Sequence, residues 1–249
     1  MPGTLGLCCF EMNFYRRSDL QPKNLELLAR YDREILRLLG SDYAYPVRMR
    51  DWELCQVLQA MESVPAAARI LDTGAFNTYL GLYLSGTHRN ITVSDLLWTR
   101  ARKSLQRRLG LAPFKPTEAG YLTWYRAMRR HGLKVTNLDL TRIGYPDRAF
   151  DCIVSLSVIE HIPAVEQALA EMYRVLAPGG KLLVTTDCSR EPHPFAKGVR
   201  YFSTGELDRL FAGYPVTSPR NQPDFAPENW CYGGKLPVVT CFIEITKPR

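Results

Sequence analysis

The apolar positions near the N-terminus predict two helices. Leucine and isoleucine recur at near-helical spacing over residues 24–39, and Gly40 follows as a stop signal. Residues 49–61 predict a second helix after the tyrosine-rich loop 41–46. We expect these helices to form an N-terminal helical extension over residues 1–65.

Beyond residue 65 the pattern changes to short β-branched runs that alternate with longer helical segments. Such alternation is typical of parallel strands joined by crossover helices. The predicted strands are 69–72, 90–94, 134–137, 151–156, 181–186 and 238–246. The predicted helices between them are roughly 79–84, 96–109, 121–131, 164–176 and 203–211.

Several of these strands are apolar on both faces, as in a parallel sheet with helices on both sides. Residues 178–180, Pro-Gly-Gly, predict a sharp turn into a strand. The last strand, 238–246, partly alternates, which favours an antiparallel position near the sheet edge. The predicted fold of residues 66–249 is α/β: a doubly wound, Rossmann-like mixed sheet, mostly parallel.

The charge of the chain is concentrated in one segment. The 249 residues include 32 Lys and Arg against 25 Asp and Glu, a net charge of +7. Ten of the basic residues lie in residues 100–134 with one acid, Glu118, so this segment carries +9 and the rest carries −2. We expect a basic helical insertion at 96–133, which could engage nucleic acid, an anionic surface or an acidic partner, or form a solvated face.

The cysteines and the apolar runs exclude several classes of protein. The seven cysteines are scattered, without a C-x-x-C pair or a histidine at metal-ligand spacing, so we predict no metal site. Scattered thiols are typical of an intracellular chain, and we expect a cytoplasmic location. The N-terminus is not a convincing signal peptide, and no apolar run is long enough to span a bilayer.

Polar residues follow the predicted strands at their carboxyl ends, where ligands bind in open α/β sheets. Asp72, Asp95 and Asp139 come at the ends of the first three strands. Asp95 lies 23 residues after Asp72, close to the ~20 expected of a carboxylate that binds a ribose diol. Asp95 could equally cap the helix that begins at Leu96.

The motifs resemble those of class I S-adenosylmethionine-dependent methyltransferases. ILDTGAF, ITVSD, NLDL, FDCIVSLSVIEHI and RVLAPGGKLL follow one another in that family's order, from about residue 66 to the C-terminus. The resemblance implies S-adenosylmethionine as the cofactor and a loop around its methionine part, a ribose carboxylate, adenine contacts and a further loop contact. The loop around the methionine part would be formed by Asp72, Thr73, Gly74, Ala75 and Phe76, and the ribose carboxylate would be Asp95. The adenine contacts would be Leu96, Asp139 and Leu140, and the further loop contact would be Ser155.

The glycine-rich loop departs from the family pattern. The family has D-x-G-x-G-x-G, whereas this chain retains only Gly74 and carries Phe76 and Thr78 at the later glycine positions. Either the loop follows another path or the cofactor pocket is partly filled. The N-terminal extension would cover this crevice, with Tyr43, Tyr45 and Trp52 lining it or packing in the core.

Methyl transfer from a sulfonium is a direct displacement, so the protein mainly orients the reactants and excludes water. Where the acceptor must lose a proton, a general base assists, and His161 is the candidate because it follows the fourth strand's loop. The alternative is that His161 only orients this loop through a hydrogen bond.

Three functions from different classes follow from these observations. The first is methylation of a small-molecule acceptor, anionic or linked to a lipid or sugar. The second is methylation of RNA or another nucleic acid, with the basic segment binding the phosphates. Against it, SLSVIEHI lacks the N/D-P-P-Y/F type of tetrapeptide that is associated with methylation of base amino groups in the resembled family. The third is a methyltransferase-like binding protein without catalysis. The sequence makes no prediction of the oligomeric state.

Overall fold

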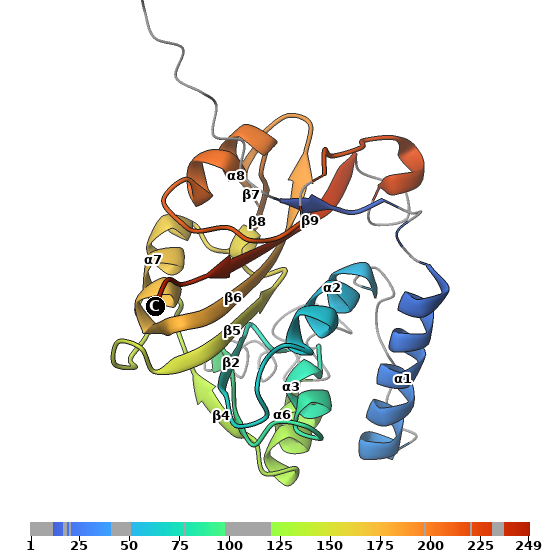
Figure 1. The fold of residues 1–249 in the computed structure, drawn as a ribbon, viewed down its shortest axis with the longest axis vertical. Helices are drawn as coiled ribbons and strands as arrows, with labels where there is room; N and C mark the ends of the chain where they lie inside the picture. Colours follow the sequence, from blue (N-terminus) through green and yellow to red (C-terminus); the bar gives the residue numbers. More distant parts are fainter. Residues whose placement is uncertain are drawn as a thin grey trace, which may run out of the picture.

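A computed structural model describes residues 12–16, 19, 21–40, 51–76, 78–97, 121–196, 198–219, 221–230 and 237–249. Its main sheet has the strand order β1-β9-β6-β5-β2-β3-β4 (Figure 1). The strands are β1 (Asn13–Phe14), β2 (Arg69–Thr73), β3 (Asn90–Asp95), β4 (Lys134–Asn137), β5 (Phe150–Leu156), β6 (Leu176–Ser189) and β9 (Val238–Thr246). A separate hairpin pairs β7 (His193–Ala196) with β8 (Val199–Tyr201).

Strands β4, β3, β2, β5 and β6 pair in parallel, and β9 runs antiparallel to both β6 and β1. The strand order reverses between β2 and β5, which makes this the topological switch point. This arrangement confirms the predicted mixed, mostly parallel α/β sheet, with each predicted strand present at its expected place.

Helices cover both faces of the sheet (Figure 1). One core joins it to α1 (Pro22–Leu39), α2 (Asp51–Met61), α3 (Leu80–Leu84) and α6 (Tyr121–Arg130). The other core joins it to α7 (Val165–Val175) and α8 (Thr204–Phe211). Two short 3-10 turns, η4 (Ile159–His161) and η5 (Pro227–Asn229), complete the described helical segments. The predicted helix at 96–109 lies, beyond residue 97, outside the described residues.

The α1 helix shows why the apolar pattern works. Leu28, Tyr31 and Ile35 are buried on one stripe of the helix. Pro22 stands in the first helical turn, and Gly40 ends the helix with φ +75°. The described helices include none that is both long and apolar enough to cross a membrane.

The Pro-Gly-Gly turn is built differently from the prediction. Strand β6 begins at Leu176, before the turn, and its pairing with β5 shifts register between Phe150 and Cys152. A Cβ on Gly180 would lie 2.8 Å from the carbonyl oxygens of Ala177 and Asp151, so this irregularity needs a glycine. The turn therefore lies inside the strand, as an irregularity of its pairing.

Candidate functional site

The strand ends around the switch point bring together most of the predicted site. Thr73 pairs with Ser94 on one side and with Ser155 on the other. Asp72 and Asp95, at the ends of β2 and β3, are both buried. The sheet itself therefore fixes the spacing of the polar residues at this edge.

Asp72 is a fully enclosed carboxyl group that anchors the following helix. Its Oδ2 accepts a hydrogen bond from the backbone N–H of Gly81 in α3, with a donor–acceptor distance of 3.2 Å. Burial is the main cause that raises the pKa of Asp72 to about 7; the bond from Gly81 lowers it, and the charge of Asp95 adds a smaller increase within that value. At neutral pH this group is therefore close to the midpoint of its titration.

Asp95 holds the loop that follows β2. Its Oδ2 accepts from the N–H of Phe76 at 3.2 Å, and its Oδ1 accepts from the N–H of Leu96 at 2.7 Å. The N–H of Ala75 donates to the carbonyl of Ser94 at 2.9 Å. Asp95 thus ties the loop after β2 to β3. Its bond to the next residue, Leu96, is not the bond to the second or third helical N–H that a cap makes, so the capping role stays a prediction.

Gly74 occupies a position that excludes a side chain. Its φ is +60°, and a Cβ there would lie 2.5 Å from Cγ2 of Val158, in the loop after β5. The one glycine retained from the family pattern is therefore the residue at which two loops of the switch point meet.

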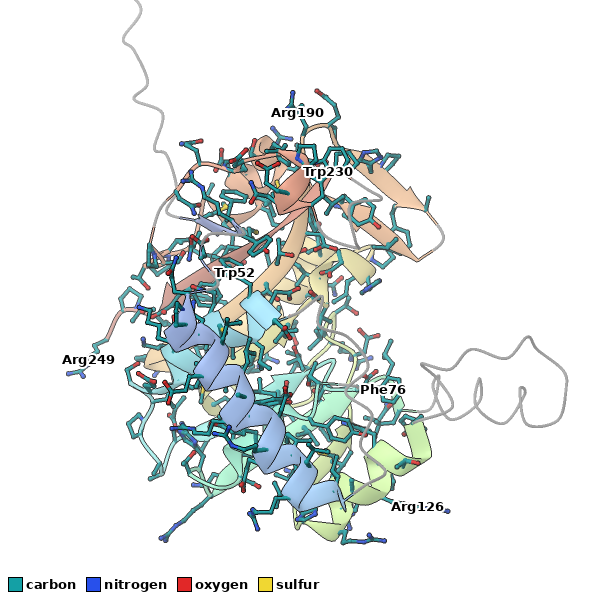
Figure 2. The ribbon with its side chains drawn as sticks, turned by 90° about the vertical axis from the view of Figure 1, so that its right-hand side faces the viewer. Trp52, Phe76, Arg126, Arg190, Trp230 and Arg249 are labelled. Atoms are coloured by element: carbon teal, nitrogen blue, oxygen red, sulfur yellow. The ribbon has the colours of Figure 1, made fainter. Side chains whose placement is uncertain are left out.

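Phe76 resolves the question of the loop path. Its ring is buried and packs against Tyr121 and Trp124 of α6, with ring centroids 5.7 and 5.8 Å apart. Figure 2 shows Phe76 beside the upper end of this helix. Its side chain is part of the core under α6, so the loop follows a path that turns this ring into the core.

The remaining predicted cofactor residues differ in exposure. Leu96 is 47% exposed, and Leu140 is buried. Asp139 is exposed, and its Oδ1 accepts from the N–H and the hydroxyl of Thr141 at 2.9 and 2.7 Å, which closes a local turn. Ser155 is fully buried, and its hydroxyl has no hydrogen-bond partner among the described residues.

His161 lies at the end of η4, with an exposed side chain. Its Nδ1 is 2.7 Å from the carbonyl oxygen of Gly198, so this nitrogen donates to the turn between β7 and β8. This is the loop-orienting contact that the sequence offered as the alternative to proton transfer.

Sequence reasoning missed one buried acid at this edge. Glu53 of α2 is 3% exposed, and its Oε2 accepts from the hydroxyls of Ser157 and Thr185 at 2.6 and 2.5 Å. A signal was present, because Glu53 interrupts a helix whose neighbouring positions, Trp52 and Leu54, are apolar. A glutamate among buried apolar residues is expected to have hydrogen-bond or ionic partners within the protein.

Other predicted features lie outside the described residues or away from the crevice. The basic residues from 98 to 120, and Tyr43 and Tyr45, are outside them. Trp52 is buried beside Tyr15, with ring centroids 5.7 Å apart. Arg126 of α6 is exposed, and Figure 2 shows its side chain directed outwards. Within the described segments, no group of three His, Cys, Asp or Glu is arranged to hold a metal ion.

Residues 118–184 match a protein-family model described as a methyltransferase domain. Over 78 residues the chain is 33% identical to the ubiquinone/menaquinone biosynthesis C-methyltransferase UbiE of Citrobacter koseri, a match covering 31% of each protein. Over 132 residues it is 26% identical to the phosphatidylethanolamine N-methyltransferase of Cereibacter sphaeroides, covering 51% of this chain and 55% of that protein. The chain thus spans from about a third to about half of these relatives' length.

Two solved structures share the fold. The 1,6-didemethyltoxoflavin-N1-methyltransferase of Burkholderia thailandensis, with bound S-adenosylhomocysteine, has a TM-score of 0.52 and 20% identity, covering 92% of this chain and 91% of that one. The [4+2]-cyclase SpnF has a TM-score of 0.54 and 17% identity, covering 90% of this chain and 97% of that one. The methyltransferase-domain match over residues 118–184, the relatives named as methyltransferases and the shared fold all support the resemblance of this chain to the class I S-adenosylmethionine-dependent methyltransferases.

Proposed function

We propose that the protein transfers a methyl group from S-adenosylmethionine to a small-molecule acceptor. The observation that carries this proposal is the buried pair of strand-end carboxylates, Asp72 and Asp95, beside the tight loop at Gly74. The relatives named above are a ubiquinone/menaquinone biosynthesis C-methyltransferase, a phosphatidylethanolamine N-methyltransferase and a 1,6-didemethyltoxoflavin-N1-methyltransferase, and these names favour a small or lipid-linked acceptor.

The residues at the switch point fit this cofactor. A carboxylate accepts up to about four hydrogen bonds, and two of those on Asp95 are the backbone bonds that orient it. A Cβ on Gly74 would lie 2.5 Å from Cγ2 of Val158, so glycine at this position lets the loop after β2 pass close to the turn after β5. When bound, S-adenosylmethionine supplies an electrophilic methyl group on a positively charged sulfur.

Each residue has a role in this proposal. Asp95 would hold the ribose hydroxyls, and the remaining residues would enclose the methionine part or the adenine. The methionine part would lie against Asp72, Thr73, Gly74, Ala75 and Phe76, and the adenine against Leu96, Asp139 and Leu140. Ser155 would contact the loop side of the site. The chain's contribution to the reaction is then to orient the reactants and exclude water, as a direct displacement requires.

For His161, the bond to Gly198 supports a role in positioning the β7–β8 hairpin beside the acceptor. Proton transfer by His161 would require its other ring nitrogen, Nε2, to face the acceptor. The hairpin is largely exposed, as expected of a loop that contacts a ligand.

Calorimetric titration of the folded protein with S-adenosylmethionine and with S-adenosylhomocysteine tests the proposal. We expect binding of both, and a more than tenfold loss of affinity in Asp95→Ala, because charge-assisted bonds to the ribose are removed. Asp147→Ala is a matched control, because Asp147 is exposed and pairs with Arg174.

Absence of binding by the folded wild-type protein would defeat the enzymatic proposal in favour of a methyltransferase-like protein without catalysis. Equal affinities of the wild type and Asp95→Ala would refute the ribose role of Asp95. Tight RNA binding that weakens steeply with salt would favour the nucleic-acid alternative for the acceptor.

A further inference from the structure

A buried carboxylate outside the proposed cofactor contacts joins the N-terminal helices to the carboxyl edge of the sheet. Glu53 belongs to α2, which contacts β5, β6 and β9. It is 3% exposed, so its charge is removed from bulk water. A carboxylate in this position is retained only if polar groups of the protein compensate for its desolvation.

Two hydroxyls provide that compensation, and both belong to the edge of the sheet. Ser157 Oγ and Thr185 Oγ1 donate to the same oxygen, Oε2 of Glu53, at 2.6 and 2.5 Å. Thr185 Oγ1 also accepts from the N–H of Ser157 at 2.9 Å. The three residues therefore form a closed network in which the glutamate accepts charge-assisted bonds.

This network holds a turn in an unusual conformation. Ser157 has φ +50°, in the left-handed region that residues other than glycine rarely adopt. Such a conformation persists when the surrounding contacts determine it. Here those contacts are the bonds of the Ser157 N–H to the carbonyl and hydroxyl of Thr185, and of its own hydroxyl to Glu53.

The turn at Ser157 also packs against the Gly74–Phe76 loop, which belongs to the proposed cofactor site. Val158 follows Ser157, and its Cγ2 would be 2.5 Å from a Cβ on Gly74. Two residues after Gly74, the N–H of Phe76 donates to Asp95. A continuous series of contacts thus runs from the N-terminal extension to the proposed ribose carboxylate, through Glu53, Ser157, Val158, Gly74, Phe76 and Asp95.

We infer that Glu53 is a positioning residue for S-adenosylmethionine: through Ser157 it fixes the turn against which the Gly74–Phe76 loop is set. Helix α2 of the N-terminal extension then contributes to the cofactor site through Glu53. This inference rests on the proposed function, because it concerns the same site.

Affinity for S-adenosylhomocysteine, measured by calorimetry, tests this role in a set of variants. Residues along such a contact series change coupling enough to alter affinity roughly two- to thirtyfold. We expect Glu53→Gln, which removes the charge, to weaken binding within this range, and Glu53→Asp, which keeps the charge, to weaken binding less. Glu62→Gln is the matched control, because Glu62 follows α2 and is exposed.

A double-mutant cycle separates positioning from general damage to the fold. Ser157→Gly removes the hydroxyl but keeps the left-handed backbone, which glycine adopts readily. If Glu53 acts through Ser157, the double variant Glu53→Gln/Ser157→Gly should bind no more weakly than the weaker single variant. Thermal unfolding of each variant establishes that it is folded.

The two proposals fail in different ways. If the wild type does not bind S-adenosylhomocysteine, the proposed function fails. If the wild type binds and the folded Glu53 variants bind equally well, or if the two losses add, the positioning role of Glu53 is overturned while the proposed function stands.

Discussion

Asp72 illustrates how a strand-end residue acquires unusual chemistry. The sheet places its carboxyl group under α3, where the N–H of Gly81 is its hydrogen-bond donor and Asp95 is a neighbouring charge. Desolvation is the largest cause of its raised pKa, so the protonated form is favoured over a wide pH range. A group of this kind links the stability of the fold to pH.

The pKa of Asp72 is 3.8 in the unfolded reference and about 7 in the folded protein. Between these values the folded state binds more protons than the unfolded state, so the free energy of unfolding falls as pH rises through this window. We expect Asp72→Asn to remove this fall, gaining a few kcal/mol relative to the wild type between pH 4 and pH 8.

Thermal or urea unfolding at a series of pH values measures this difference. Titrations of other groups are common to both proteins and cancel in the comparison. Asp224→Asn is the control, because Asp224 is exposed. Parallel pH profiles for the wild type and Asp72→Asn would show that Asp72 does not titrate in this range.

Gly81 provides a second test at the residue scale. A Cβ at this position would lie 2.4 Å from Cγ1 of Val93 on β3, whereas Gly144 has no atom within 4 Å of its Cβ position. We expect Gly81→Ala to cost about 1–3 kcal/mol in the free energy of unfolding, because it overpacks the contact between helix and sheet. Gly144→Ala should change it by less than about 0.5 kcal/mol.

Urea denaturation measures both variants. If overpacking is the cause, Gly81→Ala should cost less in a Val93→Ala background than in the wild type. Val93→Ala alone is also destabilising, because it leaves a small cavity. Additive losses in the double variant would contradict this explanation.

The sequence predicted the positions of Asp72 and Asp95 because each ends a buried strand, and strand ends can be located from apolar runs. It did not predict the role of Glu53, because an acid between the apolar residues Trp52 and Leu54 indicates a paired carboxylate but does not identify its partners. Its partners, Ser157 and Thr185, lie more than 100 residues away along the chain. Only the folded chain brings them to the same place.

At the scale of elements, the long strands were predictable and the edge of the sheet was not. The strands with continuous apolar runs carry a pattern that distinguishes them from loops. Strand β1 has two residues, Asn13 and Phe14, which are too few for any periodicity. It exists because β9 offers an unpaired edge to which this short segment adds.

The exposed side of β1 is closed by a side chain instead of another strand. Asn221 Oδ1 accepts from the N–H of Phe14 at 2.6 Å, and its Nδ2 donates to the carbonyl of Phe14 at 2.7 Å. Its own N–H donates to the carbonyl of Met12 at 3.1 Å. One asparagine thus reproduces the hydrogen bonds of a neighbouring strand and protects the edge.

We expect Asn221→Ala to lower the free energy of unfolding by about 1–3 kcal/mol, because two backbone groups of Phe14 lose their partners. Hydrogen exchange of the Phe14 amide should become faster. Asn90→Ala is the control, because Asn90 is exposed and makes one side-chain bond to the carbonyl of Ala67. Unchanged exchange at Phe14 would contradict this role.

At the scale of the whole molecule, the sequence predicted a mixed sheet with helices on both faces, and the structure confirms it. Alternating strand and helix patterns restrict the topology to very few arrangements. The path of the loop at Phe76 could not be predicted, because it depends on a cluster with Tyr121 and Trp124 from a distant helix.

The pairing of β1 with β9 sets the order in which the chain can complete its sheet during synthesis. Residues 13–14 are synthesised more than 200 residues before their partners at 241–242. Non-local pairings form late because their loops are long, and a domain folds as a unit once its strands are available. Until β9 is made, β6 also lacks its antiparallel neighbour, so the growing chain exposes an unpaired strand edge whose residues are buried in the complete sheet.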